Sequence, residues 1–129
     1  KVNYENLVAS DVKVVADAEQ LKRVIHNIIG NSVKYLDKPE GIIQIRIKDK
    51  DEYVQVDIED NGSGISDKEL PFIFDRFYRA DTSRSTKTGG SGLGLAIAKK
   101  VIEDHFGEIW ASSKKGEGTT ISFTLKKAL

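Results

Sequence analysis

The sequence predicts an α/β fold, a two-layer α/β sandwich in which a mixed sheet of about five strands carries about three helices on one face. Short segments that alternate apolar and polar residues predict the strands, and longer segments with apolar residues at helical spacing predict the helices. These elements do not follow one another as a simple β-α-β repeat. A mixed sheet with its helices on one face therefore fits their order best.

A strand and a long helix are expected first. Residues 12–15 have a strand-like run of valines, and Asp17 is a residue type that commonly caps helix N-termini. Apolar residues then recur at helical spacing, which predicts one amphipathic helix over 18–36. Its apolar side consists of Leu21, Val24, Ile25, Ile28, Ile29, Val33 and Leu36.

A hairpin and a helical turn are expected next. Residues 37–41 break the helix, and residues 42–48 and 53–59 then alternate apolar and polar side chains as two strands. The polar residues 49–52 link these strands as a hairpin turn. Residues 67–70 are expected to form a short helical turn.

The rest of the chain is expected to contain a loop, a helix and two strands. Residues 80–91 have almost no apolar content, which predicts a mobile loop. The helix that follows should run from Leu95 to about residue 105 and end at Gly107 as its C-cap. Residues 108–112 and 119–126 alternate like two further strands.

Length and composition limit the possible functions. With 129 residues the chain is expected to form a single domain, 1–129. Twenty basic and twenty acidic residues balance, which argues against a dedicated nucleic-acid binder, and the absence of cysteine excludes disulfides and thiolate metal sites. No apolar run has the length of a membrane span. Because the sequence begins at Lys1, we expect a fragment of a longer protein, and any membrane anchor would lie outside this fragment.

The segment from Asp60 to Ile65 joins the end of a predicted strand to two glycines, Gly62 and Gly64. A carboxylate at that position can accept a hydrogen bond from a ligand amine, and the glycines permit close approach of another group to the backbone. Taken alone, the segment is equally compatible with an ordinary surface turn.

Two more glycine clusters follow, over 89–94 and at Gly116 and Gly118. The cluster over 89–94 opens directly into a predicted helix, where free N–H groups and the helix dipole favour phosphate. It is not a Walker A loop, because the Gly-Lys-Ser/Thr ending is missing. It is not a dinucleotide fingerprint either, because no strand leads into it.

Asn27, Asn31 and Lys34 lie on one face of the predicted helix over 18–36. Amide oxygens are suitable Mg²⁺ ligands, although a single Asn on a helix is usually only solvated. The poor helix formers Gly30 and Ser32 in the same helix indicate that another group approaches closely there.

These motifs together resemble the nucleotide-binding boxes of bacterial two-component sensor histidine kinases. Residues 27–35 resemble the N box, residues 60–64 and 89–95 the first two glycine boxes, residues 72–79 the F box, and residues 116–119 the third glycine box. The boxes follow the order of the family. The resemblance implies the catalytic and ATP-binding domain of such a kinase, with the Bergerat-type fold shared by gyrase, Hsp90 and MutL.

The resemblance implies that Asp60 binds the adenine amino group and that Gly62 and Gly64 let the backbone pass close to the base. Thr119 would orient Asp60, and Ile65 belongs to the same adenine end of the site. The other implied nucleotide-binding residues are Tyr35 beside the adenine or ribose, and Gly90, Gly92 and Gly94 in the loop over the phosphates. Leu93 and Leu95 would seat the helix behind that loop.

For phosphate and metal the resemblance implies a second group of residues. Asn31, helped by Asn27, would ligate Mg²⁺, while Lys34 and one or both of Arg76 and Arg79 would contact phosphate oxygens. Residues 80–91 would form the ATP lid. Some of these positions also have purely structural interpretations: Phe72 and Phe74 are expected to pack in the core, and Arg76 can form a surface ion pair.

Related ATPases of this fold carry a Glu one helical turn before the magnesium Asn, where this chain has Asn27. An amide cannot act as a general base near neutral pH, so phosphoryl transfer is expected rather than hydrolysis. Neither His26 nor His105 has the sequence context of the phosphoacceptor of the family. We therefore expect a kinase fragment that does not phosphorylate itself.

The expected partners are the dimerisation and phosphoacceptor domain of the same kinase and, through the full-length kinase, a response regulator. No nucleic acid and no direct membrane contact are expected, and the domain should be the cytoplasmic part of a membrane-anchored kinase. Two alternatives remain: a serine kinase of the anti-sigma-factor type and an adaptor that binds no nucleotide.

Overall fold

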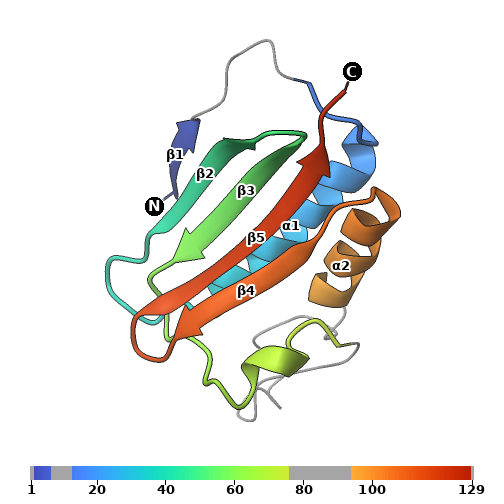
Figure 1. The fold of residues 1–129 in the computed structure, drawn as a ribbon. Coiled ribbons are helices and arrows are strands. Elements are labelled where there is room, and N and C mark those ends of the chain that lie inside the picture. The colour runs from blue at the N-terminus through green and yellow to red at the C-terminus, as the bar shows by residue number, and fades with distance from the viewer. Residues whose placement is uncertain (1, 7–12, 76–93, 129) are drawn as a thin grey trace.

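The computed structural model describes residues 2–6, 13–75 and 94–128. Two α-helices cover one face of a five-stranded sheet with the strand order β1-β2-β3-β5-β4 (Figure 1). β1 pairs in parallel with β2, and the other pairs are antiparallel. The elements are β1 (Val2–Asn6), α1 (Ala18–Lys34), β2 (Ile43–Lys50), β3 (Tyr53–Asp60), the 3-10 helix η1 (Leu70–Phe72), α2 (Gly94–Asp104), β4 (Ile109–Lys114) and β5 (Gly118–Lys126).

The predicted α/β sandwich with a mixed sheet is confirmed, and the element counts differ slightly. In place of three helices on one face, the described residues contain two α-helices there and the three-residue η1. The strand expected over 12–15 is wrong in position. β1 lies at Val2–Asn6, whereas Val14 forms only an isolated bridge to Lys127, and residue 12 lies outside the described residues. The parallel pairing of β1 with β2 joins distant segments, which local alternation does not reveal.

α1 begins where the sequence predicts. The Asp17 side chain accepts hydrogen bonds from the backbone N–H groups of Glu19 and Gln20 at 3.0 and 3.2 Å. Val24 and Ile28 are fully buried, whereas Val33 is 55% exposed although the pattern placed it on the apolar side. At 3.6 residues per turn, Val33 lies nearly opposite these two side chains.

α2 ends in a Schellman-type turn whose left-handed residue is Phe106, not the expected Gly107. Phe106 has a φ of 64°, and the N–H of Gly107 reaches back to the Ile102 carbonyl at 2.9 Å. Gly107 is instead required by a close approach, because a Cβ at that position would overlap the Thr124 carbonyl. The position of the predicted helix end is therefore shifted by one residue.

His105 links the end of α2 to the start of α1. Its Nε2 accepts the backbone N–H of Asp17 at 3.1 Å, and its Nδ1 lies 2.7 Å from the Val101 carbonyl. Both contacts are satisfied by the neutral ring with its proton on Nδ1. The ring therefore connects two helices that are distant in sequence.

We expect His105→Ala to lower the free energy of unfolding by about 1–2 kcal/mol, because it removes both hydrogen bonds and leaves the Asp17 N–H without its partner. Urea unfolding measures this change. His26→Ala is the matched control, since His26 is exposed on α1, and it should stay within about 0.5 kcal/mol of the wild type. Equal effects of the two substitutions would contradict the proposed role of His105.

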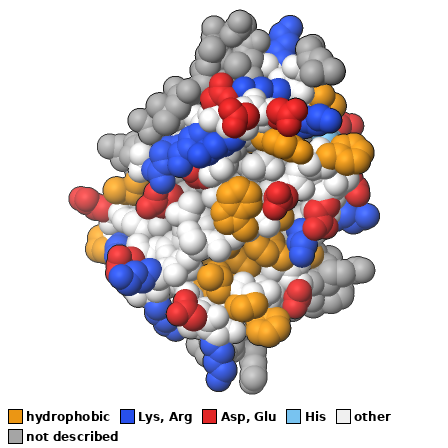
Figure 2. Space-filling view, viewed as in Figure 1, with side chains coloured by type: hydrophobic (Ala, Val, Ile, Leu, Met, Phe, Trp, Pro, Cys, Tyr) orange, Lys and Arg blue, Asp and Glu red, His pale blue; other side chains and the backbone are white. Residues whose placement is uncertain are grey.

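The two faces of the sheet differ in character. The face beneath the helices is apolar and contains the fully buried Ile58 and Phe123. The open face, shown in Figure 2, carries basic and acidic side chains among polar atoms and a few hydrophobic groups. Arg46 pairs there with Glu59 across β2 and β3. Because apolar side chains fill the space between the sheet and the helices, a polar site on the helix-covered side is best sought at the ends of the strands.

Candidate functional site

The helix-covered side of the sheet becomes polar at one end. By strand register, Ser113, Thr119 and Asp60 lie side by side on β4, β5 and β3, and Ser32 of α1 belongs to the same buried group. Asp60, Thr119 and Ser32 are 3%, 4% and 1% exposed. Four polar side chains at the edge of an apolar core are costly unless they have partners. This polar end is the candidate site.

Asp60 is a buried carboxylate with polar groups on several sides. Its Oδ1 accepts the backbone N–H of Gly62 at 2.9 Å. Burial raises the pKa of Asp60, and the charge of Glu59 adds to the rise, whereas the N–H groups of Gly62 and Thr119 and the Ser32 hydroxyl partly offset it. The carboxylate is thus held in place while retaining the capacity to accept another hydrogen bond.

The Ser32 hydroxyl is the unsatisfied group of the site. It lies close enough to Asp60 to lower the pKa of that carboxyl, yet no described atom meets its oxygen at hydrogen-bond distance and angle. A buried hydroxyl without a partner is uncommon in folded proteins. Beside a carboxylate, it offers a donor and an acceptor to a ligand.

Three glycines shape the loops around Asp60 through contacts with the backbone of the chain itself. A Cβ at Gly62 would overlap the Tyr35 carbonyl, one at Gly64 the Lys114 carbonyl, and one at Gly118 the Asp60 carbonyl. Gly64 and Gly118 also have φ values of 74° and 136°, which disfavour other residues. The first and third glycine clusters are therefore packed against each other beside Asp60.

Ser113 connects the loop after Asp60 to β5. Its hydroxyl accepts the Ile65 N–H at 2.7 Å, donates to the Gly118 carbonyl at 2.9 Å and lies 2.7 Å from the Thr119 hydroxyl. The Ile65 side chain itself is 6% exposed and belongs to the hydrophobic core. The structure therefore places Thr119 beside Asp60 and links the Ile65 backbone to Thr119 through Ser113.

The polar face of α1 carries the other candidates. Asn27 and Asn31 lie one turn apart, and Asn27 faces the first residue of α2, because a Cβ at Gly94 would lie 3.8 Å from the Asn27 Cβ. At the end of the helix, Lys34 Nζ is 5.7 Å from the centre of the Tyr35 ring. Burial, and to a lesser degree Glu69, raises the pKa of the Tyr35 hydroxyl.

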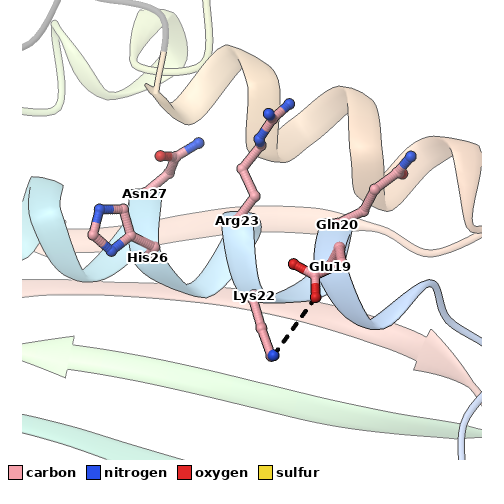
Figure 3. Close-up of a pocket in the computed structure, with 6 residues that line it drawn as sticks. All are labelled: Glu19, Gln20, Lys22, Arg23, His26 and Asn27. Atoms are coloured by element: carbon pink, nitrogen blue, oxygen red, sulfur yellow. Dashed lines mark ion pairs between the residues drawn. The ribbon is translucent and has the colours of Figure 1, made fainter.

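An open groove of ≈ 710 Å³ runs along α1 and ends at Asn27. Figure 3 shows that Asn27, Arg23 and Gln20 extend toward α2, whereas Lys22 and Glu19 point away and form an ion pair. The groove is lined by Glu19, Gln20, Lys22, Arg23, His26 and Asn27. It adjoins the candidate metal-binding face but does not include Asp60.

Several candidates from the sequence lie outside the described residues. They are Arg76, Arg79, Gly90, Gly92, Leu93 and the predicted lid 80–91. Of the F box, Phe74 packs against the core as expected, but Phe72 is 53% exposed, so its expected core role is wrong. Phe72 is part of the short η1, whose residues include none that is buried. At Gly30, no described atom comes within 4 Å of a Cβ placed there, so the close approach expected at this residue is not seen, whereas Ser32 is buried.

The sequence interpretation missed Ser113 and Lys38. Ser113 had a signal, since it is a polar residue at the inward position after Ile109 and Ala111 in an alternating strand. Lys38 had none: it lies in the loop after α1, and its hydrogen bonds reach the carbonyls of Asn61, Gly62 and Gly116. Only the tertiary structure brings these segments together.

No described helix is long and apolar enough to cross a membrane.

Comparison with known proteins identifies one family and a set of related sensor kinases. Residues 16–129 match the family described as histidine kinase-, DNA gyrase B-, and HSP90-like ATPase. Sensor histidine kinase WalK of Bacillus subtilis (strain 168) is 45% identical over 123 residues, which are 93% of this chain and 20% of WalK. WalK of Staphylococcus aureus (strain Newman) is 42% identical over 111 residues, 84% of this chain and 18% of that protein.

Solved structures agree with these relatives. The mycobacterial sensor histidine kinase MprB superposes with a TM-score of 0.82 at 31% identity, covering 98% of this chain and 84% of that one. The nucleotide-free catalytic domain of histidine kinase ThkA gives a TM-score of 0.79 at 28% identity, covering 98% and 78%. The chain spans about a fifth of the length of the curated relatives it matches. It belongs to the histidine kinase-, DNA gyrase B-, and HSP90-like ATPase family, among the catalytic domains of sensor histidine kinases.

Proposed function

We propose that this domain binds ATP with Mg²⁺ and presents the γ-phosphate to a histidine on a separate dimerisation domain of its parent kinase. A response regulator would then receive the phosphoryl group from that histidine. The parent would be membrane-anchored, with this domain in the cytoplasm. The observation that carries the proposal is the buried Asp60 carboxylate beside the unpartnered Ser32 hydroxyl, at the end of β3.

These residues fit an adenine base. An ionised carboxylate accepts hydrogen bonds only, so the free capacity of Asp60 suits the adenine amino group. The Ser32 hydroxyl can donate to or accept from the base edge, directly or through a water molecule. Thr119 would hold Asp60 through its backbone N–H, which already favours the ionised carboxyl.

The polar face of α1 fits the metal and the phosphates. Asn27 and Asn31 would hold Mg²⁺ with their amide oxygens, and the ion, when bound, would neutralise phosphate charge. No group of three or more His, Cys, Asp or Glu side chains gathers in the described part of the chain to hold a metal by itself. Asn27 lies beside Gly94, where the N-terminal end of α2 favours an anion. Lys34 would contact phosphate oxygens.

Phosphoryl transfer to a protein side chain is favoured over hydrolysis. Asn27 occupies the helix position at which a carboxylate would activate water, and an amide accepts no proton near neutral pH. The residues of this chain would therefore position the nucleotide and stabilise charge, and the acceptor would come from another domain. The serine kinase and the nucleotide-free adaptor remain the alternatives, and the adaptor leaves the polar pair of Asp60 and Ser32 unexplained.

Titration of the purified domain with ATP, with and without Mg²⁺, tests the proposal. We expect binding that is strengthened by Mg²⁺, because the metal screens repulsion between the phosphates. With radiolabelled ATP, the domain alone should acquire no label and should transfer label to an added dimerisation domain. Absence of ATP binding would favour the adaptor, and label on His26 or His105 would contradict the assignment of the acceptor to another domain.

A further inference from the structure

The peptide group that joins Asn61 to Gly62 is held at both ends. Its N–H donates to Asp60 Oδ1 at 2.9 Å, and its carbonyl oxygen accepts a hydrogen bond from Lys38 Nζ at 2.6 Å. A cation at the carbonyl end polarises the peptide and strengthens the hydrogen bond made by its N–H. Lys38 therefore acts on Asp60 through one peptide group.

The next peptide group is held in the same way. The N–H of Ser63 donates to the Tyr35 carbonyl at 2.9 Å, and the Gly62 carbonyl accepts from Lys38 Nζ at 3.1 Å. Tyr35 is the C-cap residue of α1. The segment that follows α1 thus fixes the orientation of both peptide groups after Asp60.

A third bond from Lys38 reaches the other glycine turn. Nζ lies 3.3 Å from the Gly116 carbonyl, so the ammonium group uses its three donors on three backbone carbonyls. The N–H of Gly116 in turn donates to the Ser63 carbonyl at 2.6 Å. The side chain is 40% exposed, and its ion pair with Asp37 is long, at 3.7 Å, so the carbonyl contacts are its main interactions.

We propose that Lys38 is a positioning residue for base recognition: by holding the Asn61–Gly62 peptide it keeps Asp60 Oδ1 engaged and aims the other carboxylate oxygen at the adenine amino group. The inference rests on the proposed function of Asp60. It assigns a role to a residue outside all of the sequence motifs. All three hydrogen bonds of Lys38 go to backbone carbonyls, so it acts on the ligand through Asp60.

The test compares Lys38→Met with Lys115→Met in the 129-residue domain. Both substitutions remove one positive charge near the same turn, and Lys115 is exposed. The probes are ATP and inosine triphosphate, which has a carbonyl oxygen in place of the adenine amino group. We expect Lys38→Met to weaken ATP binding about tenfold, the scale of a lost charge-assisted hydrogen bond, with little change for inosine triphosphate.

The ratio of the two affinities separates positioning from general stability. A merely structural role would lower the affinity for both nucleotides equally, whereas loss of Asp60 alignment lowers their ratio. Lys38→Arg keeps the charge and the N–H donors and should restore most of the ratio. Lys115→Met should retain it.

Amide hydrogen exchange provides a nucleotide-free measurement. Gly62 and Ser63 should exchange about tenfold faster in Lys38→Met than in Lys115→Met, because their peptide groups lose one anchor. If the wild-type domain prefers ATP but the two variants show equal exchange rates, or equal ratios of ATP to inosine triphosphate affinity, the role of Lys38 is overturned and the proposed function stands. A wild-type domain that binds neither nucleotide, or both equally, would overturn the proposed function as well.

Discussion

Asp60→Asn should weaken ATP binding by about 1–3 kcal/mol, roughly fivefold to over a hundredfold, while leaving the domain folded. The Asn side chain can keep its oxygen on the Gly62 N–H, so its amide group would face the adenine amino group donor to donor. Isothermal titration of ATP against the two proteins measures the loss. Unchanged affinity would mean that the base binds elsewhere.

Asp57→Asn is the matched control, because Asp57 lies on the same strand but on the open face of the sheet. Its carboxylate contacts Lys48 Nζ and Gln55 Nε2, each at 2.8 Å. Burial raises the pKa of Asp57, but these hydrogen bonds and one from Ser122 outweigh it, so the net pKa is lowered. We expect Asp57→Asn to lower the free energy of unfolding by about 1–2 kcal/mol and to leave ATP affinity unchanged.

The opposite pKa directions of these carboxyls give opposite pH dependence. Asp57, with a lowered pKa, contributes stability above its ordinary value of 3.8, and this is lost as the pH falls through the folded value. Because the pKa of Asp60 is raised, its ionised carboxylate lowers the free energy of unfolding at neutral pH. Asp60→Asn removes that charge, so it should not destabilise the domain at neutral pH. ATP affinity should fall as acid protonates Asp60, and this contribution should disappear in Asp60→Asn.

Gly118→Ala should destabilise the domain by about 3 kcal/mol or more, because two independent costs combine. The φ of 136° disfavours a side chain, and a Cβ would overlap the Asp60 carbonyl. Relief of that overlap would move β5 away from β3 where Thr119 supports Asp60, so nucleotide binding should be lost as well. Thermal unfolding and ATP titration measure the two effects.

Gly116→Ala separates these costs. Gly116 also has a positive φ, 89°, but no described atom lies within 4 Å of a Cβ built there. The Gly116→Ala variant should therefore lose only about 1–2 kcal/mol of its free energy of unfolding to backbone strain, and it should keep its affinity for ATP. If both substitutions cost the same, the contact with the Asp60 carbonyl contributes little.

The parts of the fold that depend on local pattern were predictable. Alternation placed the β2–β3 hairpin, and helical spacing with the Asp17 cap placed α1. The position of the first strand and the end of α2 were not predicted correctly, because both depend on contacts with distant parts of the chain. β1 is defined by pairing with β2, and Phe106 takes the left-handed conformation in a turn whose next residue, Gly107, packs against Thr124.

The sequence by itself determined the family and supplied the candidate residues of the site, because its motifs place a carboxylate, two amides and three glycine clusters at characteristic spacings. Only the tertiary structure decided how the site is held together. Gly62 and Gly118 are required by the Tyr35 and Asp60 carbonyls, and Lys38 joins two glycine turns. Such contacts link segments far apart in the chain, so no local pattern encodes them; folding brings their backbone groups within reach.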